Sequence, residues 1–143
     1  MTVTRDEMIK AIKAGTVPAL RRLGFKGSYP HFYRDREGHV DLLTFQFSAY
    51  GGRLTAEISF ATSSRDNLHP VYKDTPASKL RVYFTGKRKR LGADGYGDHW
   101  FIYDQPMPQY GEVAQDPTTI ADQLATLAAT QGDSWWSEMR VGS

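Results

Sequence analysis

The feature that most constrains the fold is the unbroken alternation of side chains over residues 54–61. Successive side chains of a strand point to opposite faces of a sheet, so this pattern predicts a strand with one face against a core. Such strands are typical of antiparallel sheets that are covered on one face. One side of the strand carries Leu54, Ala56, Ile58 and Phe60, and the other carries Thr55, Glu57, Ser59 and Ala61.

A hairpin is expected immediately before this strand. Residues 31–36 and 40–49 flank Glu37-Gly38, which is a short turn signal. Because the side-chain period is two, Leu43, Phe45 and Phe47 share one side of the second hairpin strand. We assign that side to the core.

The chain after residue 61 is less regular. Residues 62–78 have no hydrophobic period, and we expect a long excursion that carries a short helix. A fourth strand is expected at residues 80–85 and a fifth at residues 99–104, joined by the glycine-rich loop 86–98.

Helical periodicity marks the N-terminal part of the chain. A helix over residues 5–23 begins with a capping box at Thr4. Pro18 lacks an N–H group, which predicts a kink or break at residues 15–17. Gly24 is placed to end the helix in a left-handed conformation.

A second helix is expected near the C-terminus. Asp116 provides a cap and Pro117 occupies the first helical position, whereas Gly132 predicts the end of the helix at about residue 131. The pair Trp135-Trp136 is expected to cover an open edge of the core, and the alternative is a partner anchor.

These elements predict one α+β domain over residues 1–143. Its antiparallel sheet has about five strands, and an N-terminal helix and a C-terminal helix pack on one face. The chain has no cysteine, which excludes disulfides, thiolate metal sites and cysteine nucleophiles. No apolar run approaches the length of a membrane span, and residues 1–16 lack a signal-peptide pattern, so we expect a cytoplasmic protein without membrane association.

Several short motifs are similar to those of a bacterial family, domain of unknown function 4304. They are the Leu-Gly-Phe-Lys turn at residues 23–26, the aromatic step at residues 32–34, the Phe-Gln step at residues 45–46, and the stretches 88–92 and 99–101. The resemblance covers roughly residues 5–104, and it has Trp100-Phe101 where the family has two tryptophans. It implies a small α+β fold with no established catalytic residues. Some similar proteins belong to toxin–immunity neighbourhoods, which favours a partner-binding domain.

The candidate partner-binding residues lie around a basic run. A glycine-rich loop with four successive cations and nearby rings suits an acidic protein partner, or the phosphates and bases of a nucleic acid. A solvated loop that aids solubility is the simpler interpretation. A net charge of 18 − 16 = +2 is small for a general nucleic-acid binder. The candidates are Arg81, Lys87, Arg88, Lys89, Arg90 and Trp100.

A second candidate surface is the polar side of the central strands. Gln46 and Glu57 fall on the side opposite the core residues and would contact a ligand if that face is open. A strand that faces solvent needs the same alternation, so an ordinary exposed surface is the alternative.

No motif indicates catalysis or a resident cofactor. His31, His39, His69 and His99 have no spacing that pairs two metal ligands, and the serines lie in no nucleophile motif. We therefore predict no catalytic residues, no metal site and no cofactor. The leading hypothesis is a noncatalytic, immunity-like protein-binding domain. The alternatives are a nucleic-acid-binding module that uses loop 86–98, and an enzyme for a small molecule bound between sheet and helices.

Overall fold

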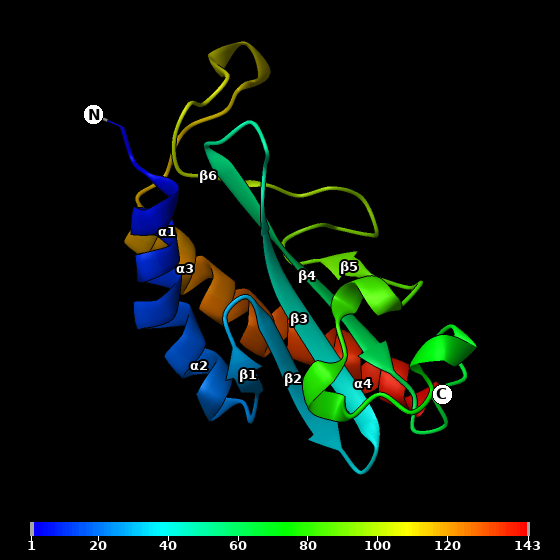
Figure 1. The fold of residues 1–143 in the computed structure, drawn as a ribbon. Helices are drawn as coiled ribbons and strands as arrows, with labels where there is room; N and C mark the ends of the chain where they lie inside the picture. Colours follow the sequence, from blue (N-terminus) through cyan, green and yellow to red (C-terminus); the bar gives the residue numbers. More distant parts are fainter. Residues whose placement is uncertain (1, 143) are drawn as a thin grey trace.

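The computed structural model describes residues 2–142 and shows these residues folded around one antiparallel sheet of six strands (Figure 1). Positions 1 and 143 of the predicted domain lie outside the described residues. The helices are α1 (Arg5–Ala11), α2 (Val17–Arg22), α3 (Pro117–Leu127) and α4 (Asp133–Val141), and the strands are β1 (Lys26–Ser28), β2 (His31–Arg36), β3 (His39–Phe47), β4 (Arg53–Ala61), β5 (Lys89–Arg90) and β6 (Phe101–Ile102).

The four N-terminal strands lie side by side in the order β1-β2-β3-β4. The far edge of β4 is shared by two short strands, because β5 pairs with Glu57 and Ile58 whereas β6 pairs with Arg53 and Leu54. The hairpin of β2 and β3 and the strand β4 confirm the expected central strands. The β1 strand was not anticipated from the sequence.

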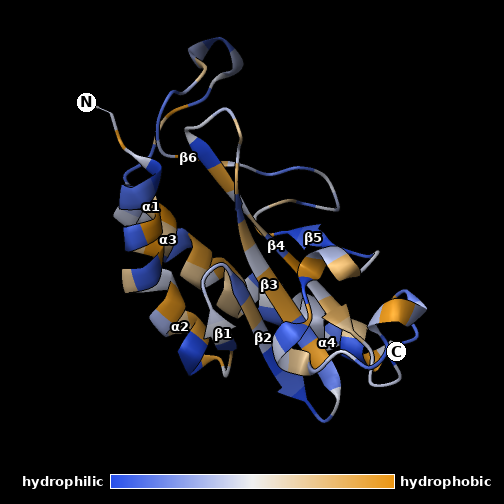
Figure 2. Cartoon of the chain, in the orientation of Figure 1, coloured by the Kyte–Doolittle hydropathy of each residue, from blue (hydrophilic) through white to orange (hydrophobic). Residues whose placement is uncertain are grey.

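All four helices cover one face of the sheet (Figure 1). The predicted core side of β3 and β4 packs there, with Leu43 and Ile58 opposite each other in the register. Figure 2 shows apolar stretches on the central strands and on α3, whereas most of α1 and β5 is hydrophilic. The helices contribute Met8, Ile12, Leu20, Ile120, Leu124, Ala128, Trp135 and Trp136 to this core.

The other face of the sheet is covered by the irregular segment 62–85 over only part of its area. A second apolar cluster forms there, in which Val40 and Leu42 of β3 pack against Leu68, Leu80 and Val82. This segment is green in Figure 1 and lies over one end of β2, β3 and β4. The remaining part of the face stays open and carries the polar residues described below.

A buried arginine ties the helical layer to the sheet. Arg34 of β2 pairs with Asp41 of β3, with Nε 2.8 Å from Oδ2, and with Asp133 of α4, with a second nitrogen 2.8 Å from Oδ1. It also donates to the Leu23 carbonyl at the end of α2, at 2.9 Å. Its guanidinium carbon lies 5.3 Å from the Trp136 ring centroid. Burial raises the pKa of Asp41, and the neighbouring arginines oppose that effect.

Three strand predictions need correction. Residues 80–85 form a 3₁₀ turn at Val82–Phe84 instead of a strand, because the Phe84 and Thr85 N–H groups bond back to Arg81 and Val82. Alternating burial there comes from packing on the second sheet face, without a strand ladder. Of residues 99–104 only Phe101–Ile102 form a strand. Conversely, the expected loop 86–98 contains β5.

The predicted bend of the N-terminal helix is confirmed. A π-helical turn, Ile12–Thr16, separates α1 from α2, immediately before Pro18. The Thr16 hydroxyl donates to the Ala121 carbonyl at 2.8 Å, which fixes the bend against α3. Gly24 has φ +97° and ends the helix as expected.

The predicted end of the C-terminal helix at Gly132 is wrong. The chain continues through a π-helical turn, Ala128–Gly132, into α4. A Cβ at Gly132 would lie 3.0 Å from the Trp136 ring and 3.5 Å from the Leu91 side chain, so this glycine permits close packing inside a continuing helix. The core role predicted for Trp135 and Trp136 is confirmed, since both are buried.

We expect the Arg34→Ala variant to be about 3–5 kcal/mol less stable, because it leaves Asp41 buried without its main partner. Urea unfolding followed by circular dichroism measures this loss. The exposed Arg22→Ala provides a matched control, with a change below about 0.5 kcal/mol. The double variant Arg34→Met/Asp41→Leu should recover most of the loss. A cost below about 1 kcal/mol for Arg34→Ala would contradict a central role for the network.

Candidate functional site

The open part of the second sheet face contains a polar hollow of about 270 Å³. The predicted residues Gln46 and Glu57 both line it, on neighbouring strands β3 and β4. The predicted Arg88 enters from the chain that leads to β5. The structure therefore brings together residues from both candidate surfaces. The hollow is lined by His31, Thr44, Phe45, Gln46, Glu57, Tyr83 and Arg88.

Glu57 is the acidic centre of this surface. Its carboxylate lies 3.6 Å from a terminal nitrogen of Arg88 and 3.9 Å from Nε of Arg90. Arg90 is its register partner on β5 and also lies 3.4 Å from Asp98. Two carboxylates therefore offset the charge of the two arginines, and the surface is polar with little excess positive charge.

Both arginines are held in place by other contacts. Arg88 donates through Nε to the Thr85 carbonyl at 2.9 Å and through a terminal nitrogen to the Tyr83 carbonyl at 3.3 Å. The guanidinium carbon of Arg90 lies 5.0 Å from the ring centroid of Trp100. Arginines fixed in this way lose less side-chain freedom when a further group binds.

The two lysines of the basic run belong to a different surface. Because side chains alternate along β5, Lys89 points away from the face that carries Arg88 and Arg90. Lys89 is only 8% exposed, and its ammonium donates to the carbonyls of Ala93 at 3.0 Å and Gly95 at 2.6 Å. Lys87 is exposed and lies 5.7 Å from the Tyr96 ring. The four cations thus form no single patch.

The residues that the sequence reasoning did not include are His31, Thr44 and Tyr83. His31 and Thr44 are register partners on β2 and β3, with 3.1 Å between His31 Nδ1 and the Thr44 hydroxyl. The alternation that placed Gln46 on this face also places Thr44 there, so this signal was present in the sequence. Tyr83 is carried in by the 3₁₀ turn and is 59% exposed.

Arg81 lies outside the hollow but acts on it electrostatically. It donates to the carbonyls of Ser78 at 3.3 Å and Leu80 at 3.0 Å. Burial lowers the pKa of His31, and the positive charge of Arg81 lowers it further. His31 is therefore neutral near pH 7 and offers the surface one ring N–H donor and one acceptor.

The family assignment comes from comparison with known proteins. A sequence model of the family described as Domain of unknown function (DUF4304) matches residues 16–136, and the chain belongs to this family. The match includes the C-terminal helix, beyond the expected range of roughly 5–104, and begins later in the N-terminal helix. The comparisons with curated proteins and with solved structures found no match.

Two further searches concern residues 2–142. Within that range, no helix has the length and apolar character needed to cross a membrane. Among the same residues, no three or more histidine, aspartate or glutamate side chains are placed to hold one metal ion.

We expect Lys89→Met to reduce the free energy of unfolding by about 1–3 kcal/mol, because it leaves two carbonyls without their charged donor. The methionine retains the apolar length of the side chain. Lys87→Met removes the same charge from an exposed position and should change stability by less than about 0.5 kcal/mol. Chemical denaturation of both variants measures the difference. Equal effects would show that Lys89 has no special structural role.

We expect Arg81→Gln to raise the pKa of His31 towards its ordinary value of 6.5, because the variant removes a nearby positive charge. A pH titration of the imidazole followed by NMR measures this, with the exposed Lys73→Gln as control. The depressed pKa also means that stability from His31 is present above pH 6.5 and is lost as pH falls through the folded-state pKa. An unchanged or lower pKa in Arg81→Gln would contradict this coupling.

Proposed function

We propose that the domain is a noncatalytic module that binds a protein partner in the cytoplasm through the open part of the second sheet face. The observation that supports this most is the exposed Tyr83 ring beside two arginines that intrachain contacts already hold. Tyrosine, tryptophan and arginine are the residues that most often dominate protein interfaces. The proposed contact surface consists of Gln46, Glu57, Tyr83, Arg88, Arg90 and Trp100.

The charge balance of this surface favours a protein over a nucleic acid. Glu57 and Asp98 lie beside the two arginines, and Lys89 is buried with carbonyl partners. Nucleic-acid binding derives most of its affinity from cations that are free to neutralise phosphates. A folded protein with both donors and acceptors on its surface complements the mixed polar groups better. An immunity protein that captures a bacterial toxin is the specific form of this proposal.

The test is capture from a lysate of the source cell with the full chain immobilised. We expect a partner that survives nuclease treatment, and Tyr83→Ala should reduce its recovery at least tenfold, as truncation of an interface hot spot does. Tyr110→Ala is the matched control, because Tyr110 is 76% exposed but lies in a different loop. Recovery of the control should equal that of the unchanged protein.

Two results would contradict the proposal. Recovery that depends on intact nucleic acid, with an affinity that falls steeply with salt, would support the nucleic-acid alternative. Equal recovery with Tyr83→Ala and Tyr110→Ala would place the partner surface elsewhere. Folding of both variants is verified by circular dichroism before capture.

A further inference from the structure

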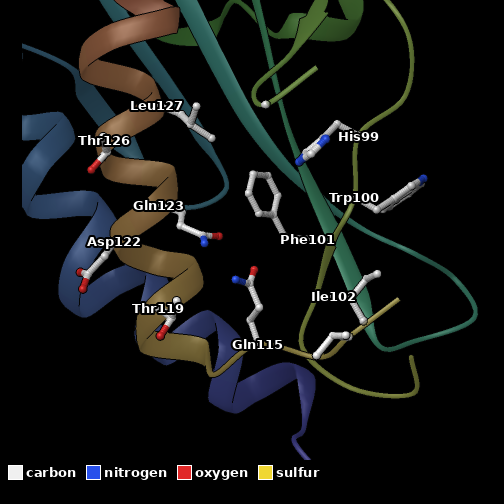
Figure 3. Close-up of a pocket in the computed structure, with 12 residues that line it drawn as sticks. His99, Trp100, Phe101, Ile102, Gln115, Thr119, Asp122, Gln123, Thr126 and Leu127 are labelled. Atoms are coloured by element: carbon white, nitrogen blue, oxygen red, sulfur yellow. The ribbon is translucent and has the colours of Figure 1, made fainter. Parts of the chain in front are cut away.

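A second and larger cavity lies away from the proposed partner surface. It is a cleft of about 740 Å³ between α3 and the segment 99–102, at the edge of β4 (Figure 3). One wall carries Phe101 and Ile102, and the opposite wall carries Gln123 and Leu127 of α3. The volume lies within the usual range for small-molecule sites, and two facing walls suit a flat ligand.

Two glutamine amides point into this cleft. In Figure 3 the side chains of Gln115 and Gln123 approach the Phe101 ring from the same end of the cleft. Neither amide has a hydrogen-bond partner among residues 2–142. Each amide offers donors and an acceptor next to each other, so together they match a ligand whose edge alternates donors and acceptors.

Both amides are carried by ordered backbone. The Gln115 N–H donates to the Ile102 carbonyl at 2.8 Å, and the next residue, Asp116, caps α3. Gln123 lies within α3 itself. Groups on fixed elements recognise a ligand more selectively than groups on loose loops.

The charge of the cleft excludes an anionic ligand. Among the described residues that line it, Asp122 carries the only ionised side chain, and Figure 3 shows it directed away from Phe101. The His99 ring packs edge-on to Phe101, with 4.9 Å between ring centroids, and burial lowers the pKa of this histidine. The cleft therefore contains no fixed positive charge for a phosphate or carboxylate.

An uncharged flat ring with a donor–acceptor edge is the chemistry of a nucleobase. Glutamine amides pair in a bidentate manner with the adenine edge, and apolar side chains pack on base faces in protein pockets. A sugar would need a widely exposed aromatic face, whereas Phe101 is only 5% exposed. We propose that the cleft binds an uncharged nucleobase, as a free base or nucleoside, through Gln115 and Gln123.

The experiment uses the full-length protein and adenosine as the first probe, followed by the other common nucleosides and free bases. Trp100 lines the cleft, whereas the other two of the three tryptophans are buried, so tryptophan fluorescence reports mainly on this site. We expect a saturable change with at least one probe. Titration calorimetry measures the same affinity independently, and Trp100→Phe should abolish the optical signal while retaining the heat.

The variants separate specific recognition from general adhesion. We expect Gln123→Ala and Gln115→Ala each to weaken binding about tenfold, because each removes hydrogen bonds to the base edge. Gln109→Ala is the matched control, since Gln109 is exposed and lies outside the cleft lining. The corresponding nucleoside monophosphate should bind several-fold more weakly than the nucleoside.

Three results would overturn the proposal. They are the absence of saturable binding for the whole panel, equal affinities in Gln123→Ala and Gln109→Ala, and tighter binding of a monophosphate or a monosaccharide than of any nucleoside. These outcomes are independent of partner capture, because Tyr83 does not line this cleft.

Discussion

The buried guanidinium of Arg34 is the contact on which the arrangement of layers depends. It joins β2 to β3 through Asp41, to the end of α2 through the Leu23 carbonyl, and to α4 through Asp133. An ion pair buried this deeply contributes little net stability, yet it is costly to break because each partner then lies uncompensated. Only one arrangement of helices against the sheet satisfies all these bonds together. The network therefore specifies which face the helices cover and leaves the opposite face to the irregular segment 62–85.

The two sites both follow from how the edge of β4 is shared. β5 and β6 pair with different parts of β4, and the chain between them leaves the sheet and returns at Trp100. Arg90 on β5 reaches the polar face and lies over Trp100, while Trp100 also lines the cleft beside α3. A single side chain therefore borders both surfaces. Two short strands in place of one long strand leave room for a polar hollow on one side and a cleft on the other.

The parts of the fold with a local signal were predictable from the sequence. The β2–β3 hairpin, β4, the bend before Pro18 and the core role of the tryptophan pair each depend on period, turn chemistry or a missing donor within a few residues. The errors occurred where packing determined the backbone. Leu80 and Val82 alternate because they cover a sheet face, and Gly132 is small because Trp136 lies against it. Neither cause can be distinguished in a sequence from a strand or a helix end.

The candidate site was predictable to the same extent and for the same reason. Gln46 and Glu57 were found because alternation alone assigns them to a face, and the structure places Arg88 beside them. The basic run looked uniform in sequence, but pleating of β5 sends Lys89 to the opposite side from Arg90, where it bonds to carbonyls of its own loop. The cleft required α3 to lie opposite residues that precede it by some twenty positions, a distance that no local pattern specifies. A run of like charges therefore indicates a binding surface only after the strand that carries it has been paired, because pairing determines which cations remain available.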